Sequence, residues 1–178
     1  MRKVLVLGCA GSGKSTFSTR LGHLTGLSVI HLDSYYWKAG WIAATEEEWD
    51  QTIDELLNHD SYIMDGNYSR TLNKRLMDAD VVFYFDFPRL LCIYRAIKRR
   101  IINHGRTRED MAAGCKEKID LEFLRWIWNF RTRNRGKILE ALDQVKEQTQ
   151  VIIFRTTKEV KEYLAGMEST RGNACAGR

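Results

Sequence analysis

The sequence of 178 residues has a single proline, Pro88, and no apolar run long enough to cross a bilayer. Its apolar N-terminal run, residues 4–7, leads straight into a glycine-rich loop, so we do not expect a secretory signal peptide. The four cysteines form no C-x-x-C pair and have no metal-ligand spacing, which argues against a zinc site and favours reduced thiols in a cytosol. We therefore expect a cytoplasmic protein without a membrane segment.

The composition suits one folded domain. With 44% hydrophobic residues, the chain can bury one substantial core. We expect a single domain over residues 1–166. Residues 167–178 offer little to bury, and we expect them to be a disordered tail.

The glycine-rich loop is the stretch GCAGSGKS, residues 8–15. Its glycines and the Lys-Ser pair at its end satisfy the spacing G-x-x-x-x-G-K-[ST] in full. A β-prone apolar run precedes the loop and apolar residues at helical spacing follow it, which is the context in which such a loop binds nucleotide phosphates. We expect the following residues to bind the nucleotide: Gly8, Gly11, Ser12, Gly13, Lys14, Ser15 and Thr16.

The residue types of this loop fit Mg·ATP. Gly11 and Gly13 allow positive φ and a close approach of the backbone, whose N–H groups would bind phosphate oxygens. Lys14 would reach the β- and γ-phosphates, and Ser15 would bind Mg²⁺. ATP and Mg²⁺ are therefore the expected cofactors.

Strand and helix patterns alternate along the chain. The β-prone runs are residues 4–7, 28–32, 62–64, 81–85 and 151–154. Among the helical patterns, one begins at a capping box formed by Thr45 and Glu48, one runs over residues 121–146, and the last runs through Leu164. Such alternation predicts an α/β fold with a parallel sheet covered on both faces, which binds ligands beyond the carboxyl ends of its strands.

Aspartates stand at the carboxyl ends of three of these strands, namely Asp33, Asp65 and Asp86. Asp33 and Asp65 should flank the glycine-rich loop, where Mg·ATP needs carboxylates and an acceptor hydroxyl needs a base. For Asp86 we expect only a turn-forming or helix-capping role, because Pro88 and a helix follow it. His31 is expected only to pack within the second strand.

Motor ATPases and GTPase switches also use such a loop, but the further motifs that these two classes need are missing from the sequence. A motor ATPase carries an apolar strand that ends in Asp-Glu, and none of the three strand ends has a Glu after its Asp. A GTPase switch carries Asn-Lys-x-Asp, and the one Asn-Lys pair, Asn73-Lys74, lacks the Asp. Phosphoryl transfer to another molecule remains.

The order of motifs resembles that of the adenylate kinase-like P-loop kinases. More closely, the stretches HLDSYYWKAGW, YIMDGNYSRTL and ADVVFYFDFPR, followed by YRAIKRR, are similar to the bacterial DNA topology modulation protein-related family. The similarity covers residues 1–165. It implies a three-layer α/β/α sandwich with five parallel strands in the order 2-3-1-4-5, an acceptor-binding insert after the second strand, and a helical, arginine-bearing lid over about residues 100–135.

The resemblance also implies roles for single residues. LDSYYW is similar to the Asp-x-Phe-Tyr stretch of uridine kinase-like enzymes, which implies that Asp33 is the base towards the acceptor hydroxyl; a metal-shell ligand is the alternative. MDGNY is similar to the Asp-Gly-Phe-Pro-Arg stretch of nucleoside monophosphate kinases, which implies that Asp65 supports the metal. Here Asn67 and Tyr68 replace Phe-Pro, and Arg70 stands one place later than the arginine of that stretch. This departure argues against a nucleoside monophosphate acceptor.

Arginines complete the expected site. YRAIKRR is similar to the helix that leads into the lid of such kinases, which implies phosphate contacts for Arg95 and Arg99, and RTRNR, residues 131–135, would return further arginines. The candidate catalytic residues are Lys14, Asp33, Arg95, Arg99 and Arg131, and the candidate metal ligands are Ser15 and Asp65.

The charge distribution leaves two classes of partner open. Residues 95–137 hold thirteen Lys/Arg against five Asp/Glu, which suits the phosphates of a nucleotide or of a nucleic acid. Because the chain adds no DNA-reading module, we favour a small-molecule kinase that transfers the γ-phosphoryl of ATP to a nucleoside- or nucleotide-like acceptor. The alternative is an ATP-dependent nucleic-acid-associated protein or a polynucleotide end-kinase.

Four aromatic residues follow the second strand, namely Tyr35, Tyr36, Trp37 and Trp41. So many aromatic side chains in one short loop are hard to bury together. We therefore expect them to form an acceptor pocket that stacks on a ring, rather than part of the core.

Overall fold

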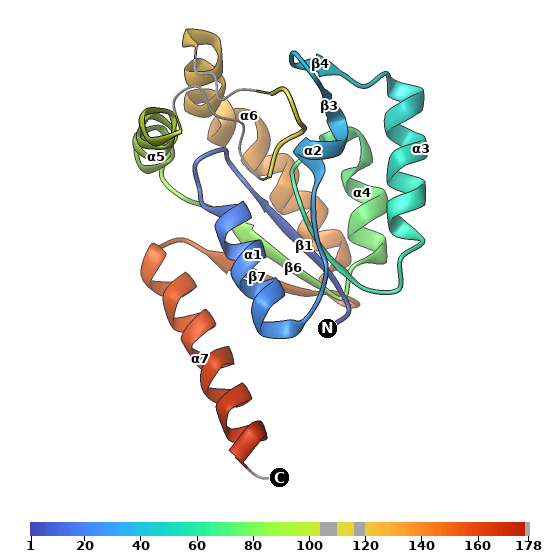
Figure 1. Cartoon of the computed structure of the whole chain (residues 1–178), viewed down its shortest axis with the longest axis vertical. Coiled ribbons are helices and arrows are strands. Elements are labelled where there is room, and N and C mark those ends of the chain that lie inside the picture. The colour runs from blue at the N-terminus through green and yellow to red at the C-terminus, as the bar shows by residue number, and fades with distance from the viewer. Residues whose placement is uncertain (104–109, 116–119, 177–178) are drawn as a thin grey trace.

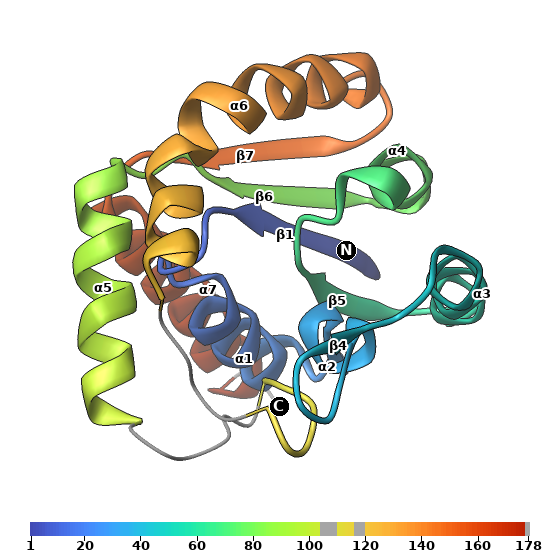
Figure 2. The same ribbon diagram turned by 90° about the horizontal axis from the view of Figure 1, so that it is seen from above.

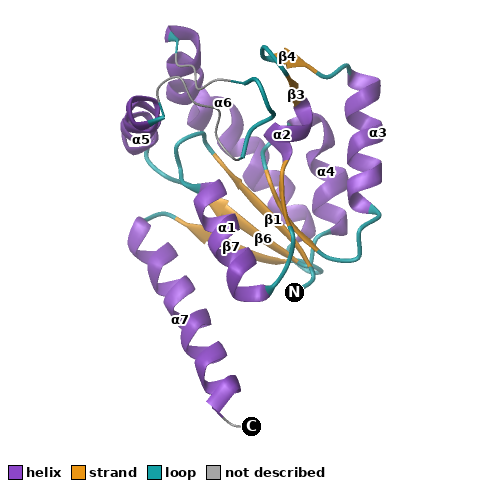
Figure 3. Cartoon of the chain, in the orientation of Figure 1, coloured by secondary structure: helices purple, strands orange, loops and turns teal. Residues whose placement is uncertain are grey.

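Five parallel strands form the central sheet of the protein, whose computed structural model describes residues 1–103, 110–115 and 120–176 (Figures 1 and 3). The strands are β1 (Lys3–Gly8), β2 (Val29–His31), β5 (Tyr62–Asp65), β6 (Val81–Phe85) and β7 (Gln150–Phe154). They lie in the order β2-β5-β1-β6-β7. Counted within this sheet alone, that is 2-3-1-4-5, the order that the resemblance implied.

Helices cover both faces of the sheet. In the described part of the chain they are α1 (Lys14–Thr25), α2 (Leu32–Tyr36), α3 (Glu46–Leu57), α4 (Ser69–Asp78), α5 (Arg89–Ile102), α6 (Leu121–Val145) and α7 (Thr157–Ala176). Helices α1 and α7 contact each other on one face, and α4 contacts both α3 and α6 on the other (Figure 2). A small antiparallel hairpin of β3 (Trp37–Lys38) and β4 (Ile42–Ala43) follows α2. The predicted three-layer α/β/α sandwich is confirmed.

The core forms where apolar strands meet helix α1. Every residue of β5 and β6 is buried, as expected for strands that are covered on both faces. Phe17 of α1 lies edge-on to Phe83 and Phe154, with ring centroids 4.9 and 5.7 Å apart. This packing fixes α1, and with it the glycine-rich loop, against the sheet.

Local signals set several helix ends as predicted. Thr45 Oγ1 accepts from the Glu48 N–H at 3.2 Å, and the Glu48 carboxylate accepts from the Thr45 N–H at 2.9 Å. This reciprocal pair is the predicted capping box of α3. Helix α6 follows the predicted pattern closely, and α5 begins directly after Pro88.

The C-terminal helix is longer than predicted. Helix α7 continues to Ala176, through most of the segment that we expected to be a disordered tail. Beyond Leu164 it keeps tertiary contacts, because Met167 packs against the core and Glu168 lies 3.2 Å from Arg20 of α1. These contacts lie far apart in the sequence, which is why a local pattern did not indicate them.

The end of β2 differs from the sequence-based expectation, and part of the expected lid lies outside the described residues. Strand β2 ends at His31, so Asp33 lies in the short helix α2 instead of at a strand tip. Of the lid expected over about residues 100–135, residues 104–109 and 116–119 lie outside the described residues.

Candidate functional site

The glycine-rich loop connects β1 to α1 at the carboxyl edge of the sheet (Figure 1). Gly8, Gly11 and Gly13 have φ values of 144°, 77° and 99°, which favour glycine. At Gly11 there is also no room for a side chain, because a Cβ would lie 2.2 Å from the carbonyl oxygen of Cys92 in α5. The loop therefore packs closely against the first turns of α5.

Three of the expected nucleotide-binding residues form the first turn of α1: Lys14, Ser15 and Thr16. Lys14 Nζ donates to the carbonyl oxygen of Cys9 at 3.2 Å, so its ammonium group lies over the loop. The hydroxyl of Ser12 is buried and has no partner among the described residues. An anion at this edge would meet backbone N–H groups, an ammonium group and the hydroxyl of Ser15.

Asp65 ends β5, immediately beside the strand that leads into the loop. Its backbone is in register with Val6 of β1 and with His31 of β2. The side chain is buried, His31 Nδ1 lies 3.1 Å from Asp65 Oδ1, and Oδ2 has no partner among the described residues. A buried carboxylate oxygen without a partner is costly unless a ligand satisfies it. Asp65 is therefore a residue that fits Mg²⁺, which prefers carboxylate and water oxygens.

His31 contacts this carboxylate, so the expectation that it only packs is wrong. Burial disfavours a charged imidazole, but the contact with Asp65 and the charges of Asp65, Asp110 and Asp33 outweigh it. As a result, the pKa of His31 is raised. When protonated, His31 places positive charge beside the carboxylate at the end of β5.

Asp33 lies in the first turn of α2, where the hydroxyl of Tyr68 donates to its Oδ1 at 2.6 Å. The ring of Tyr68 is 4.7 Å from that of Tyr36 and 4.6 Å from that of Trp49, measured between centroids. Aromatic side chains from α2 and α3 thus hold Tyr68 beside Asp33. Of the four aromatic residues expected in an acceptor pocket, Tyr36 belongs to this cluster.

The other three of those aromatic residues lie on α2 and the β3–β4 hairpin. The rings of Trp37 and Trp41 meet edge to face, with centroids 5.5 Å apart, and 48% of the surface of Tyr35 is exposed. The thiol of Cys115 donates to the carbonyl oxygen of Lys38 at 3.2 Å. The described segment 110–115, between α5 and α6, therefore rests on this hairpin.

Asn67 joins the glycine-rich loop to the segment after β5. Its side-chain oxygen accepts from the Gly8 N–H at 3.0 Å, and its amide nitrogen donates to the Gly8 carbonyl oxygen at 2.8 Å. The sequence indicated Asn67 only as a departure from a kinase pattern, because its partner lies 59 residues away.

Arg75 is a buried residue of the site that the sequence-based interpretation missed. Its guanidinium group donates to the carbonyl oxygens of Gly66 and Tyr68 at 3.0 Å each. A signal was present in the sequence, because Arg75 follows Leu72 by three residues and therefore lies on the apolar face of α4.

Of the arginines expected to contact phosphates, Arg95 lies at the glycine-rich loop. Its Nη1 donates to the carbonyl oxygen of Ser12 at 3.1 Å and its Nη2 to Thr157 Oγ1 at 2.7 Å. Arg99 follows one turn later on α5 and is half-buried. Helix α5 thus brings an arginine directly to the loop.

Asp86 pairs with arginines of α6. The expectation that it has only a turn-forming or helix-capping role is therefore wrong. Arg135 Nε donates to Asp86 Oδ1 at 2.9 Å, and Arg131 Nε lies 3.9 Å from the same oxygen. At the start of α5 there is no side-chain capping hydrogen bond. Because Asp86 is buried at the end of β6, its charge requires a partner of opposite sign. The hydrogen bond to Asp86 raises the pKa of Arg135.

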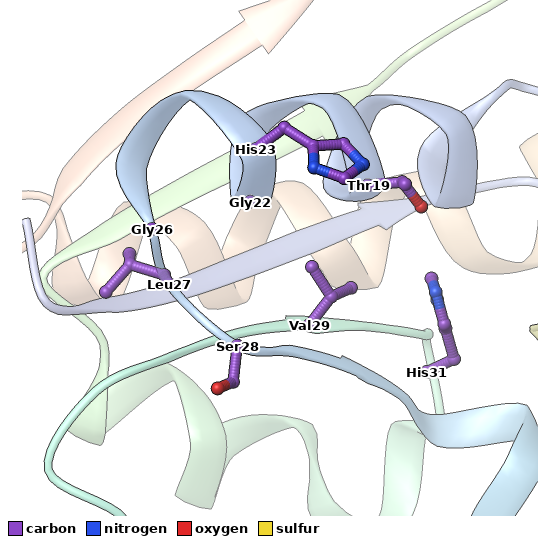
Figure 4. A pocket seen from close by; sticks show the side chains of 8 residues that line it. All are labelled: Thr19, Gly22, His23, Gly26, Leu27, Ser28, Val29 and His31. Carbon is purple, nitrogen blue, oxygen red and sulfur yellow. The ribbon is translucent and has the colours of Figure 1, made fainter.

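A shallow pocket lies between the end of α1 and the edge strand β2, from Thr19 to His31 (Figure 4). Neither the residues of the glycine-rich loop nor Asp33 line it. We therefore do not place the nucleotide there.

The described residues contain no group of three or more His, Cys, Asp or Glu side chains arranged to hold a metal ion by themselves. A Mg²⁺ ion would thus need oxygens of a bound phosphate and waters beside Asp65 and Ser15, which is its usual coordination at nucleotides. Within the same residues, no helix has the length and apolar character required to cross a membrane.

The fold matches solved structures of kinases. A gluconokinase from Sinorhizobium meliloti 1021 is similar with a TM-score of 0.55 at 16% identity, over 97% of this chain and 95% of that one. A sugar kinase from Janibacter sp. HTCC2649 gives 0.51 at 18% identity, over 95% of each chain. A shikimate kinase from Bacteroides thetaiotaomicron gives 0.50 at 13% identity, over 95% of this chain and 97% of that one. No family model and no curated protein match the chain.

The chain has the fold of the P-loop kinases. At such low identities the similarity establishes the fold alone. The narrower resemblance to the DNA topology modulation protein-related family stays a prediction.

Proposed function

We propose that this protein is an ATP- and Mg²⁺-dependent small-molecule kinase that transfers the γ-phosphoryl group to a nucleoside- or nucleotide-like acceptor. The observation that carries the proposal is a convergence at one edge of the sheet. A complete phosphate loop, the buried and partly unpartnered carboxylate of Asp65, and Asp33 all lie at the carboxyl ends of β1, β5 and β2 or directly after them. The kinase fold of the solved structures named above agrees with this function.

Each residue has a proposed task in the transfer. Backbone N–H groups of the loop and the Lys14 ammonium would bind the β- and γ-phosphates, and Ser15 and Asp65 would hold Mg²⁺. When bound, the metal ion neutralises phosphate charge. Asp33 would accept the proton of the acceptor hydroxyl while the oxygen of that hydroxyl bonds to the γ-phosphorus. At the same time, the bond between the γ-phosphorus and the β–γ bridging oxygen breaks, and ADP is released.

The arginines would stabilise the charge of the transferring group. Arg95 is already at the loop through Ser12, and Arg99 follows it on the same helix. Arg131 lies 3.9 Å from Asp86, so a contact with the phosphoryl group requires it to leave that carboxylate. Arginine forks suit the three oxygens of a loose transition state.

The surroundings of Arg70 favour an acceptor hydroxyl over an acceptor phosphate. Arg70 Nη2 lies 2.8 Å from Asp50 and its Nη1 2.6 Å from Glu46. An arginine neutralised by two carboxylates is poorly suited to bind a phosphate. The acceptor group is therefore proposed to be a hydroxyl of a nucleoside-like molecule.

The basic segment does not by itself favour nucleic acid. Three of its arginines contact groups of the protein itself: Arg95 contacts the loop, and Arg131 and Arg135 contact Asp86. Labelled ATP incubated with a panel of nucleosides, nucleotides, sugar acids and oligonucleotides tests the proposal. Transfer to a small molecule supports it. Transfer to oligonucleotide ends alone, or to none of these, would contradict it.

A further inference from the structure

The segment that joins β5 to α4, residues 66–68, has an unusual backbone. Tyr68 has φ 37° and ψ 76°, in the left-handed region that β-branched and aromatic residues rarely adopt. Among the described residues only one other non-glycine, Trp41, has a positive φ. A conformation of this kind persists only where its surroundings impose it.

Arg75 imposes it from inside the protein. Its guanidinium group is fully buried and donates to the carbonyl oxygens of all three residues 66–68, and to Thr71 Oγ1 at 3.3 Å. No carboxylate contacts this guanidinium among the described residues; the carbonyl dipoles and the Thr71 hydroxyl compensate its charge. Burial lowers the pKa of Arg75 to about 10, so the group still carries its charge at neutral pH.

The segment held in this way reaches two parts of the site. Asn67 bonds both backbone groups of Gly8 at the start of the phosphate loop. Tyr68 donates its hydroxyl to Asp33 Oδ1, while its ring lies against Tyr36 and Trp49. The hydroxyl therefore has a fixed place and a fixed partner.

We propose that Tyr68 is a positioning residue that orients Asp33 towards the acceptor hydroxyl, and that Arg75 sets the backbone conformation that makes this possible. The inference rests on the proposed function, in which Asp33 is the base. With Oδ1 occupied by Tyr68, Oδ2 is the oxygen that accepts the proton of the acceptor. Tyr68 can serve as a permanent donor, since burial and the charge of Asp33 raise its pKa.

The chain offers a matched control. Tyr62 donates its hydroxyl to Asp78 Oδ2 at 2.6 Å, the same bond at the same length. Tyr62 begins β5 and therefore lies at the opposite end of the strand that Asp65 ends. Tyr62→Phe and Tyr68→Phe each remove one hydroxyl from a tyrosine–aspartate pair, but only the second pair includes the proposed base.

Steady-state transfer to the best acceptor of the panel tests the inference. Tyr68→Phe should lower kcat about tenfold to a hundredfold, because the base is less well oriented, with the KM for ATP unchanged. Tyr62→Phe should keep the wild-type kcat. In a crystal structure of Tyr68→Phe, the Asp33 carboxylate should turn or take up more than one rotamer, a readout that needs no acceptor.

Different failures identify different errors. A wild-type kcat in Tyr68→Phe, together with an inactive Asp33→Asn, would overturn the positioning role and leave the proposed function standing. An Asp33 carboxylate that keeps its orientation in the Tyr68→Phe crystal structure would also overturn it. Full transfer by Asp33→Asn would remove the base assignment, and with it the positioning role of Tyr68, while the kinase function would still stand. Absence of transfer by the wild type to every member of the panel would instead contradict the proposed function itself.

Discussion

Gly11 and Gly26 share the same φ of 77°, but of these two glycines only Gly11 lies against another helix. At Gly26 an added Cβ would meet nothing within 4 Å, whereas at Gly11 it would lie 2.2 Å from the backbone of Cys92. Gly26 thus has a positive φ without a close neighbour, whereas Gly11 combines a positive φ with a close approach to α5. The phosphate loop needs glycine at position 11 for both reasons.

This difference gives a prediction for stability. Gly26→Ala should cost about 1 kcal/mol, the strain of a left-handed alanine, and Gly11→Ala should cost about 3 kcal/mol or more, because α5 or the loop must also move. Urea unfolding of both variants measures the two free energies. Equal losses would show that α5 does not confine the loop.

Lys14 gives a prediction for ligand binding. Lys14→Ala should abolish measurable ATP binding in isothermal titration without unfolding the protein, because its ammonium group lies over the loop and would bind the β- and γ-phosphates. Lys74→Ala is the control, since Lys74 forms an ion pair with Asp54, away from the loop. Unchanged ATP affinity in a folded Lys14→Ala protein would exclude the phosphate-loop assignment.

At the scale of elements, His31 and Asp65 link two neighbouring strands, β2 and β5. The pKa of His31 is raised in the folded protein above its ordinary value of 6.5. The charged pair therefore stabilises the protein fully below that pH, and its contribution is lost as the pH rises through the raised pKa.

The pH dependence can be measured on the apo protein. The difference in Tm between wild type and His31→Gln should be larger at about pH 6 than at about pH 8. His59→Gln, at an exposed position after α3, should show no such trend. A Tm difference for His31→Gln that is the same at both pH values would contradict the charged pair.

Helix α4 carries two arginines whose substitutions should differ sharply. Arg75→Met leaves buried carbonyl oxygens at residues 66–68 without donors and should cost about 3 kcal/mol. Arg70→Met removes only exposed ion pairs with α3 and should cost little. Chemical denaturation measures both losses, and a stable Arg75→Met protein would show that the segment does not depend on the guanidinium group.

The same elements show what the sequence could and could not predict. The parallel sheet, its order, the capping box at Thr45 and helix α6 followed from periodicity, from a local hydrogen-bond motif and from resemblance. The partner of Asp86 did not, because Arg135 is 49 residues away and a local pattern after a strand indicates only a turn. Arg75 was missed because a charged residue in an amphipathic helix is ordinarily exposed. Residues that act through distant partners are thus the part of the site that a local pattern leaves out.

At the scale of the whole molecule, the basic residues after β6 and the acidic residues before α4 have different surroundings. On the acidic side, carboxylates of α3 neutralise Arg70 and Lys74 of α4 at the surface. On the basic side, Arg95 is directed inwards to the loop. Arg95 thus places positive charge at the loop, where the proposed phosphates would bind.

That distribution leads to a prediction that separates a kinase from a nucleic-acid protein. Arg95→Ala should reduce phosphoryl transfer by on the order of 3 kcal/mol in transition-state stabilisation, whereas Lys98→Ala, at an exposed position on the same helix, should not. Duplex binding should be weak in every variant and should fall steeply with salt.

If the segment instead binds nucleic acid, both substitutions would weaken duplex binding, and each would reduce the salt slope of the binding constant by about 0.9. ATP turnover would then stay at the wild-type rate. Turnover and duplex affinity, measured at two salt concentrations on the three proteins, decide between these outcomes. Tight, salt-resistant binding that Arg95→Ala destroys, with turnover untouched, would rule out the kinase assignment of this arginine.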